Sequence, residues 1–461
     1  LKKVEVLIMA KDFTEGHPFK VIFLFSLPML IGNIFQQLYS TVDSIIVGNF
    51  VGKNALAAIS GSGSVQFLLV AISFGFTAGI SVVLSQVYGA KEYDKLKRAF
   101  STSLIFVLSL ALLLGIIGIA ISTPLLKLLG TPDDIMPDAV AYLRIMFIGM
   151  PASFLYNMCS SALRSVGDSK TPLYFLIIAS VGNIVLDLLF VAVIPMGVIG
   201  AALATIIAQC LSGVLCMIYM NKKTPIFALT RKDLIYDKQI VSAIVNYGLP
   251  TAVQNSINSV SMLAVQKFVN YFGADMMAAY GITNRIESFV TMPIMNMALA
   301  LSTYAGQNIG AGKVKRAKQG ITATAAMQAI FCFVMAFILP AFAPNLIRLF
   351  GLAEDPHVVE LGCLGISFSA KFYILFGLFQ VYNQFHKGAG DTKFSMVASL
   401  CMVAVRIPIT YWRIYIAKLG EVSIWVGMIA GWTTSLVVNF IRFVSGGWKG
   451  KAYVQLEANE E

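Results

Sequence analysis

The chain has 461 residues, of which 57% are hydrophobic and only 12% are charged, and its mean hydropathy is +0.78. This composition leaves too little polar surface for a soluble particle of that length, so it predicts a polytopic membrane protein. The formal charge of +11 could suggest a nucleic-acid partner, but membrane orientation explains it, and we exclude nucleic acid as a partner.

Twelve apolar stretches are long enough to cross a hydrocarbon layer of about 30 Å. They run approximately over 21–47, 55–87, 99–122, 139–162, 172–194, 197–220, 240–272, 276–305, 319–343, 358–385, 394–416 and 422–443. The predicted fold is an all-α membrane protein with twelve transmembrane helices in two six-helix lobes around a central cavity. The basic stretch from Lys222 to Lys238 predicts a linker, with the N-lobe over residues 1–225 and the C-lobe over residues 226–461.

The two halves of the chain repeat one another. Gly52–Ile59 resembles Gly273–Tyr280, 221 positions later, and Gln86–Ala90 resembles Gln307–Ala311. An even number of spans in each half returns the chain to its starting side. The repeats are therefore expected to be parallel, related by an axis along the membrane normal, as in some transporters.

Lys and Arg residues predict the orientation, because they are retained on the cytoplasmic side of a membrane. With the N-terminus placed inside, twenty-four of the 34 basic residues fall in cytoplasmic segments and four fall outside. We therefore expect a multi-pass protein of the plasma (inner) membrane with both termini in the cytoplasm.

Two further patterns predict structure rather than chemistry. All six cysteines fall within the spans, without the spacing of a metal site or a disulfide framework, and are expected to act as small hydrophobic residues. Gly75 and Gly79 form a small-xxx-small pattern that predicts close packing of two helices.

Three of the 23 acidic residues lie well inside the spans: Asp43, Asp187 and Glu287. Each would cost roughly 2.5–3.5 kcal/mol at the bilayer centre, so such residues usually face a cavity and carry function. The alternative is that they are hydrogen-bonded fasteners between helices.

Asp43 ends a polar stripe on the first helix, which also includes Asn33, Gln36 and Ser40. Steps of three and four residues place these side chains on one face of the helix. Asn183 and Asp187 form an i, i+4 pair on the fifth helix, and Thr205 lies on the sixth. At 1.5 Å per residue these positions have similar depths, so the acids are expected to converge in the outer half of the N-lobe.

The second half lacks this acid pair. The positions that match Asp43 and Asp187 are Val265 and Thr410. This asymmetry favours a single coupling site over a scaffold feature. Two carboxyls in a cavity of low dielectric constant can exchange a proton, and with Asn183 and Thr205 the same cage could instead hold Na⁺.

Several motifs together resemble the multidrug and toxic compound extrusion (MATE) family, and its DinF-like branch in particular. The matching segments are Ser26–Pro28, Gln36–Asp43, Gln86–Ala90, Leu163–Asp168, Asn183–Asp187 and Arg406–Pro408. The resemblance covers nearly the whole chain. It implies cation coupling at Asp43 and Asp187, completed by Asn183 and Thr205.

The same resemblance implies roles for other residues. Those expected to line the N-lobe cavity are Gln36, Tyr39, Tyr142 and Asn157, and Pro28 would let the first helix bend. Asn157 fits least well, because it lies close to the predicted cytoplasmic end of its helix.

The second half departs from the family pattern. Other branches carry acids on the seventh and tenth helices, whereas this chain has Gln254 and Asn255 on the seventh and no acid inside the tenth. Glu287 and Arg285, on the eighth helix, are the remaining candidates for a C-lobe cavity. Their spacing of two residues places them on different faces, and Glu287 is either a cavity residue or a local salt-bridge partner.

We therefore expect a secondary active multidrug efflux antiporter that exchanges amphipathic organic compounds for H⁺ or Na⁺, acts as a monomer in the lipid bilayer and uses no cofactor. Neither catalytic pairs nor a phosphate-binding loop are found, so the chain is not expected to be an enzyme. Mid-span Lys371 and Arg406 keep an alternative open, a flippase of the same superfamily that moves a lipid-linked diphosphate.

Overall fold

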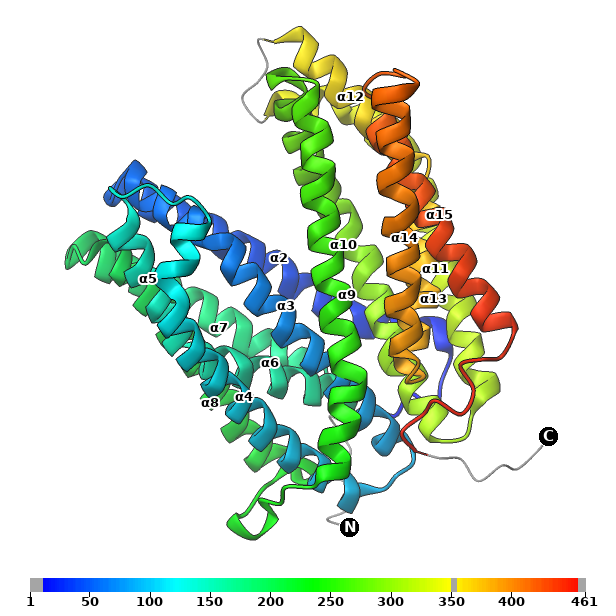
Figure 1. Ribbon diagram of the computed structural model, residues 1–461. Coiled ribbons are helices and arrows are strands. Elements are labelled where there is room, and N and C mark those ends of the chain that lie inside the picture. The colour runs from blue at the N-terminus through cyan, green and yellow to red at the C-terminus, as the bar shows by residue number, and fades with distance from the viewer. Residues whose placement is uncertain (1–10, 350–354, 455–461) are drawn as a thin grey trace. The chain divides into compact units, whose positions relative to one another are not determined.

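The computed structural model describes residues 11–349 and 355–454, and these residues form helices joined by short turns (Figure 1). The helices of the first half are α2 (Pro18–Phe50), α3 (Lys53–Gly89), α4 (Tyr93–Leu128), α5 (Met136–Ile148), α6 (Met150–Ser165), α7 (Lys170–Asp187), η1 (Leu188–Val193) and α8 (Gly197–Lys223). Two short turns, η2 (Pro225–Phe227) and η3 (Arg231–Asp233), follow in the linker. The helices of the second half are α9 (Lys238–Tyr271), α10 (Ala274–Gly310), α11 (Val314–Leu349), α12 (Pro356–Ala370), α13 (Tyr373–Gly388), α14 (Thr392–Tyr411), η4 (Trp412–Ile416) and α15 (Ser423–Val444).

These elements make twelve helical spans, which confirms the predicted fold. Eight helices, among them α7 with η1 and α14 with η4, are long and apolar enough to span a membrane on their own. The pairs α5–α6 and α12–α13 each form one span, bent by 46° and 49°. The equally long α9 and α10 complete the set and carry more polar residues, among them Gln254 and Glu287.

The duplication is visible in matching irregularities. In each half the fourth span is bent, and the fifth changes from α-helix to π-helix near its end, as η1 and η4. At the first bend Gly149 separates α5 from α6, and a Cβ there would collide with the side chain of Ile206. Pro151 follows in the first turn of α6, where its missing N–H costs nothing.

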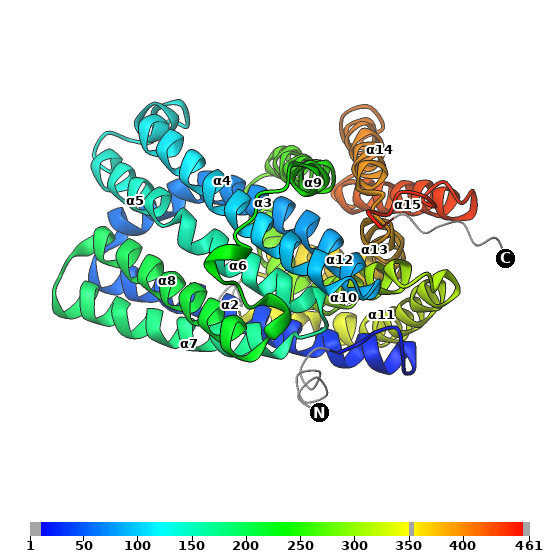
Figure 2. The same cartoon turned by 90° about the horizontal axis from the view of Figure 1, so that it is seen from below.

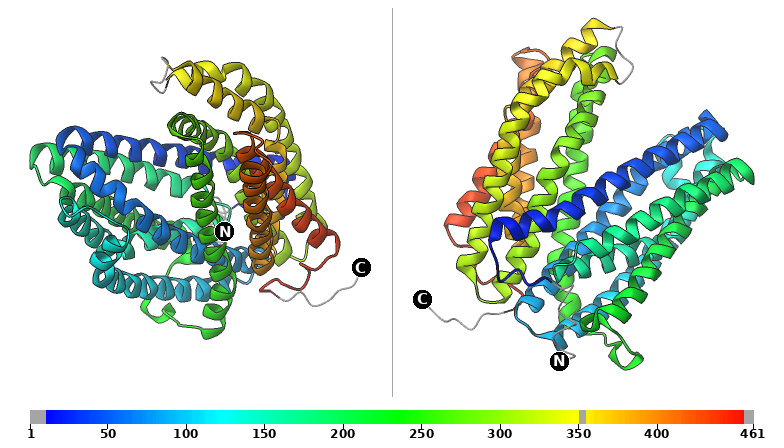
Figure 3. Two further views of the ribbon diagram at one scale, coloured as in Figure 1. Left: turned by 45° about the horizontal axis from the view of Figure 1, so that its top comes forward. Right: turned by 180° about the vertical axis from the view of Figure 1, so that it is seen from behind.

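The described chain divides into two compact units. The N-terminal unit comprises Leu27–Ala252 and the described residues before Phe13, and the C-terminal unit comprises Phe13–Ser26 and the described residues from Val253 onward. In the N-terminal unit α7 and α8 pack side by side (Figure 2). In the C-terminal unit α11 packs against α12 (Figure 3), and α14 against α15.

The boundary between these units lies later in the chain than the predicted boundary at residue 225. The linker and the start of α9 pack with the first half. Phe227 packs against Phe100 with ring centroids 4.7 Å apart, and Asp233 pairs with Lys97 at 2.8 Å. Long helices α2 and α9 each pass from one unit to the other beside a proline, at Pro28 and Pro250.

The predicted close packing at Gly75 and Gly79 is present. A Cβ at Gly75 would lie 2.6 Å from the Cα and N atoms of Ala252, and one at Gly79 would lie 2.7 Å from the N atom of Gly248. Glycine therefore allows α3 to contact the start of α9 directly, inside the N-terminal unit.

Candidate functional site

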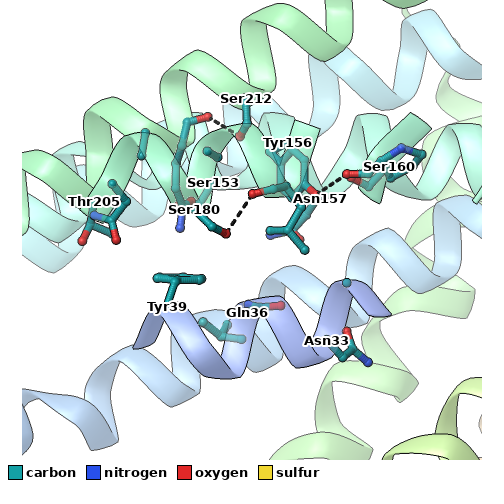
Figure 4. A pocket seen from close by; sticks show the side chains of 18 of the residues that line it. Asn33, Gln36, Tyr39, Ser153, Tyr156, Asn157, Ser160, Ser180, Thr205 and Ser212 are labelled. Atoms are coloured by element: carbon teal, nitrogen blue, oxygen red, sulfur yellow. Dashed lines mark hydrogen bonds between the residues drawn. The ribbon is translucent and has the colours of Figure 1, made fainter. Parts of the chain in front are cut away.

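A cavity of about 400 Å³ lies within the N-terminal unit, lined by residues of helices α2, α3, α5, α6, α7 and α8. Figure 4 shows Asn33, Gln36 and Tyr39 on α2 facing the side chains of the other helices across this space. The predicted residues that line it are Pro28, Gln36, Tyr39, Asp43, Tyr142, Asn157, Asn183 and Thr205. The stripe on α2 follows the cavity from Pro28 to Asp43, about 22 Å along the helix at 1.5 Å per residue.

Asp43 and Asp187 meet at one end of this cavity. Their carboxyl groups are close enough to share a hydrogen bond. Asp43 lines the cavity, whereas Asp187 lies behind it with 0% of its surface exposed. Among the described residues, Oδ1 of Asp43 and both carboxyl oxygens of Asp187 have no donor in regular hydrogen-bond geometry. Because two carboxylates have no proton to donate, a hydrogen bond between them requires one added proton.

Neutral polar groups complete this end of the cavity. Asn183 is 2% exposed, and neither its amide nitrogen nor its amide oxygen has a partner in the described part of the chain. Thr205 donates its hydroxyl proton to the Ala201 carbonyl at 3.1 Å, which leaves its oxygen able to accept or to coordinate. Tyr39 lies within electrostatic range of both acids. Asn183 and Thr205 thus line the same cavity as Asp43, and Asn183 lies one helical turn before Asp187 on α7.

The backbone changes at this point. Asp187 is the last residue of α7, and the π-helix η1 begins at Leu188. A π-turn is rare in proteins and occurs frequently at functional sites. It widens the helix directly behind the buried carboxyl, next to a cluster of apolar residues that includes Val47, Val191 and Ala202.

The cavity also has polar features that the sequence did not reveal. Tyr156 lines it and donates its hydroxyl proton to the Pro172 carbonyl at 3.1 Å. Arg164 lines the end away from the acids, and its Nε donates to the Ser160 carbonyl at 3.2 Å. Arg164 lies in the last turn of α6, where the sequence alone predicts the cytoplasmic end of a span and not a cavity residue. Asn157 also lines the cavity although it lies close to the predicted cytoplasmic end of its helix, because the cavity extends toward that end of α6.

The two predicted cavity residues of the second half do not line this cavity. Arg285 is exposed and Glu287 is buried, so they lie on different faces of α10, as their spacing predicted. Gln254 is a fastener within the C-terminal unit, because its amide donates to the Ser399 hydroxyl at 2.6 Å. Lys371 is exposed, and Arg406 is buried, with its guanidinium 3.3 Å from the Ser261 hydroxyl.

Comparison with known proteins identifies the family of the chain. The profile of the MatE family matches residues 28–189 and 250–412. A probable multidrug resistance protein of Bacillus subtilis, YoeA, is 32% identical over 443 residues, covering 94% of this chain and 95% of its own length. The probable multidrug resistance protein NorM of Thermotoga maritima is 26% identical, covering 95% and 94%.

Solved structures share the fold. A crystal structure described as MATE in the bent conformation has a TM-score of 0.89 at 22% identity and covers 96% of this chain and 98% of its own. A transporter of the MOP superfamily from Pyrococcus furiosus has a TM-score of 0.87 at 23% identity, covering 95% and 98%. The chain therefore belongs to the MATE family, as a multi-pass membrane transporter and not an enzyme.

Proposed function

We propose that this protein is a secondary active antiporter that exports amphipathic organic compounds while a cation enters at Asp43 and Asp187. The observation that carries the proposal is the contact between two carboxyls at the end of a polar cavity, one facing the cavity and the other fully buried. The names of its relatives, which include multidrug resistance and multidrug export proteins, support the substrate class. The DinF-like branch assignment rests on the same acid pair.

The buried pair supports coupling to a cation because ionising both of its carboxyls at once costs free energy. Two carboxylates cannot both stay ionised in a site of low dielectric constant, so one proton or one metal ion is needed to hold them together. The closeness of the two carboxyls favours a proton shared between them, and the oxygens of Asn183 and Thr205 make Na⁺ the alternative. One charge moving down a potential of 100 mV contributes about 2.3 kcal/mol, enough for a modest substrate gradient.

Coupling to the substrate follows from the shared cavity. Asp43 lies on the same face of α2 as Gln36, and Tyr39 is in electrostatic range of both acids. An ion that neutralises the acids therefore changes the wall against which an amphipathic substrate binds, and each ligand lowers the affinity for the other by the same factor. Pro28, also in the wall, removes one backbone hydrogen bond of α2 and gives the helix a place to bend.

The flippase alternative needs cations that are open to a diphosphate. Arg406 is 5% exposed and is engaged by Ser261. Of the two bases that kept this alternative open, only Lys371 has an exposed side chain. This arrangement disfavours a flippase.

The test is efflux of ethidium, an amphipathic cation, from proteoliposomes under a proton gradient or a sodium gradient imposed separately. Asp43→Asn and Asp187→Asn should each abolish gradient-driven efflux while the purified protein elutes as a single folded species. The matched control is Asp275→Asn, an exposed acid in the first turn of α10, which should transport normally. Normal efflux by Asp43→Asn under both gradients would refute the assigned role, and the active gradient in the wild type identifies the ion.

A further inference from the structure

The linker between α8 and α9 exposes three consecutive apolar side chains. It follows α8 and lies against α4, within the N-terminal unit (Figure 1). Leu234, Ile235 and Tyr236, the apolar triplet, are 50%, 42% and 53% exposed. Keeping such a run in water costs free energy, and contiguous exposed apolar groups mark a surface that a membrane or another molecule covers.

Backbone contacts fix the apolar triplet to α4. The Ile235 N–H donates to the Ser101 hydroxyl at 3.0 Å, and the Ile235 carbonyl accepts from the Thr102 hydroxyl at 3.0 Å. The N–H of Asp237 also donates to the Thr102 hydroxyl, at 3.2 Å. Ser101 and Thr102 are both fully buried. The loop is therefore held by its backbone, and its exposed side chains are not needed to keep it in place.

The attachment point lies where the apolar part of α4 begins. Arg98 is the last charged residue of α4 before Lys127, and α4 is long and apolar enough to span a membrane. Ser101 and Thr102 follow Arg98 by three and four residues, about 5 Å along the helix. The apolar triplet is thus held at the boundary between lipid headgroups and acyl chains. A non-helical backbone at that depth needs internal partners, which the two hydroxyls supply.

Basic residues without acidic partners surround the apolar triplet. The two acids of the linker, Asp233 and Asp237, are engaged by α4, because Lys97 and Arg98 lie 2.8 and 4.0 Å from them, respectively. No ion pair of the described residues includes the five exposed bases of this stretch, which are Lys222, Lys223, Arg231, Lys232 and Lys238. An apolar run with a basic border complements an anionic lipid surface, in which negative headgroups lie above acyl chains.

The second half provides an internal comparison. α11 matches α4 in the repeat, because its first and last residues lie 221 positions after those of α4. It too holds the segment before a long helix, since Arg316 donates to the carbonyls of Phe13 and Gly16, at 3.2 and 2.6 Å. In that segment Phe13 is fully buried, whereas Glu15 and His17 are exposed. Attachment to this helix therefore does not require exposed apolar groups, and the apolar triplet needs its own explanation.

We propose that the linker is a binding site for anionic lipid on the N-terminal unit. The apolar triplet enters the acyl boundary of one leaflet, and Arg231, Lys232 and Lys238 bind the phosphate of headgroups such as phosphatidylglycerol. The linker lies on the side predicted to be cytoplasmic, where the lipid surface is negatively charged. Because the same segment leads directly into α9, bound lipid holds the start of that helix on the N-terminal unit. The site is independent of the acid pair and of the exported compound.

Lipid-dependent stability tests the basic part of the site. Detergent-solubilised wild type is titrated with phosphatidylglycerol or phosphatidylcholine, and its thermal unfolding is measured. Phosphatidylglycerol should raise the unfolding temperature more, because a ligand that binds the folded state stabilises it, and salt should reduce the difference. Each base near an anionic surface strengthens binding about fivefold, so removing three should weaken it by about 100-fold. The variant that should lose the difference is Arg231→Gln with Lys232→Gln and Lys238→Gln.

The matched control removes three exposed bases of the C-terminal unit. It is Lys315→Gln with Lys393→Gln and Lys449→Gln, and it should keep the preference for phosphatidylglycerol. Equal losses in the two triple variants would overturn the proposal, because net charge alone would then explain the effect.

Leu234→Ser with Tyr236→Ser tests the apolar part of the site. Both side chains are exposed, so this variant should fold, and it should weaken the stabilisation that remains at high salt. In nanodiscs, a photoactivatable phosphatidylglycerol should label residues 229–240 of the wild type more strongly than a phosphatidylcholine probe does. Equal labelling by the two probes, or unchanged stabilisation of the serine variant, would refute the lipid site and leave the apolar triplet as a surface for a partner protein.

Discussion

Replacing Gly75 by alanine tests whether the contact between α3 and the start of α9 holds the N-terminal unit together. A Cβ at this position would lie 2.6 Å from the backbone of Ala252, where no flexible side chain can move aside. The contact is between two helix backbones, so the helices have to separate. Ala252 is the last residue of α9 in the N-terminal unit, so a separation of the helices would disturb α9 directly beside Pro250.

The magnitude follows from two opposing terms. Overpacking of this kind costs about 1–3 kcal/mol, and alanine in place of glycine in a helix returns up to about 1 kcal/mol. Gly63 lies on the same helix, and no described atom lies within 4 Å of a Cβ built on it. Gly63→Ala therefore gains the helix propensity of alanine without a steric cost. The difference between the two variants isolates the steric cost of about 1–3 kcal/mol, which corresponds to about 2–12 °C for a unit of this size.

Thermal unfolding of the purified variants, followed by size-exclusion chromatography, measures this difference. Gly75→Ala should unfold at a lower temperature than Gly63→Ala, and the second change Ala252→Gly should not restore the loss in full, because the Cα and N atoms of residue 252 still lie 2.6 Å from the added Cβ. If Gly75→Ala and Gly63→Ala unfold at the same temperature, or if Ala252→Gly restores the stability of Gly75→Ala in full, the two backbones are not in contact and the reasoning fails.

Two further predictions concern the loops and the linker. Gly390→Ala should destabilise the C-terminal unit more than Gly420→Ala, as thermal unfolding would show, because both glycines have positive φ angles (87° and 74°) but only a Cβ at Gly390 meets the Lys451 carbonyl. In the linker, the hydrogen bond from Lys97 holds the pKa of Asp233 below its usual value. A depressed pKa means that the contact contributes at neutral pH and is lost as the pH falls through the folded-state pKa. Lys97→Gln should therefore speed proteolysis of the linker at neutral pH, and the difference from the wild type should narrow in strong acid. Equal cleavage at neutral pH would contradict this.

The sequence predicted the spans closely, because hydrophobic length is a property of each segment alone. The predicted stretch 172–194 corresponds to α7 with η1, which ends at Val193, and the stretch 197–220 to α8. The convergence of Asp43 and Asp187 was also accessible, since i, i+4 spacing and depth along a helix are local quantities. These predictions depend on no knowledge of tertiary packing.

Properties that depend on tertiary packing could not be predicted. The sequence assigned the start of α9 to the second half, whereas its contacts through Gly248 and Ala252 place it in the N-terminal unit. The break between α12 and α13 falls at Lys371 and Phe372, where no glycine or proline marks it in the sequence. The cavity extends along α6 as far as Arg164, and no local sequence pattern shows this extent.

The two halves have the same backbone irregularities, but different side chains lie beside them. The π-turn of the first half follows the unpaired carboxyl of Asp187, whereas that of the second half follows Thr410, whose hydroxyl donates to the Arg406 carbonyl at 2.8 Å. The two bends also differ: Gly149 lies at the bend of the first half, whereas Lys371 and Phe372 lie at that of the second half. The π-turn is present in both halves, although only the first half has a carboxyl beside it. The shape of the backbone at this point is therefore a property of the scaffold. The carboxyls are therefore where the two units are free to differ in function, and substitutions there should change proton or cation binding before they change the fold.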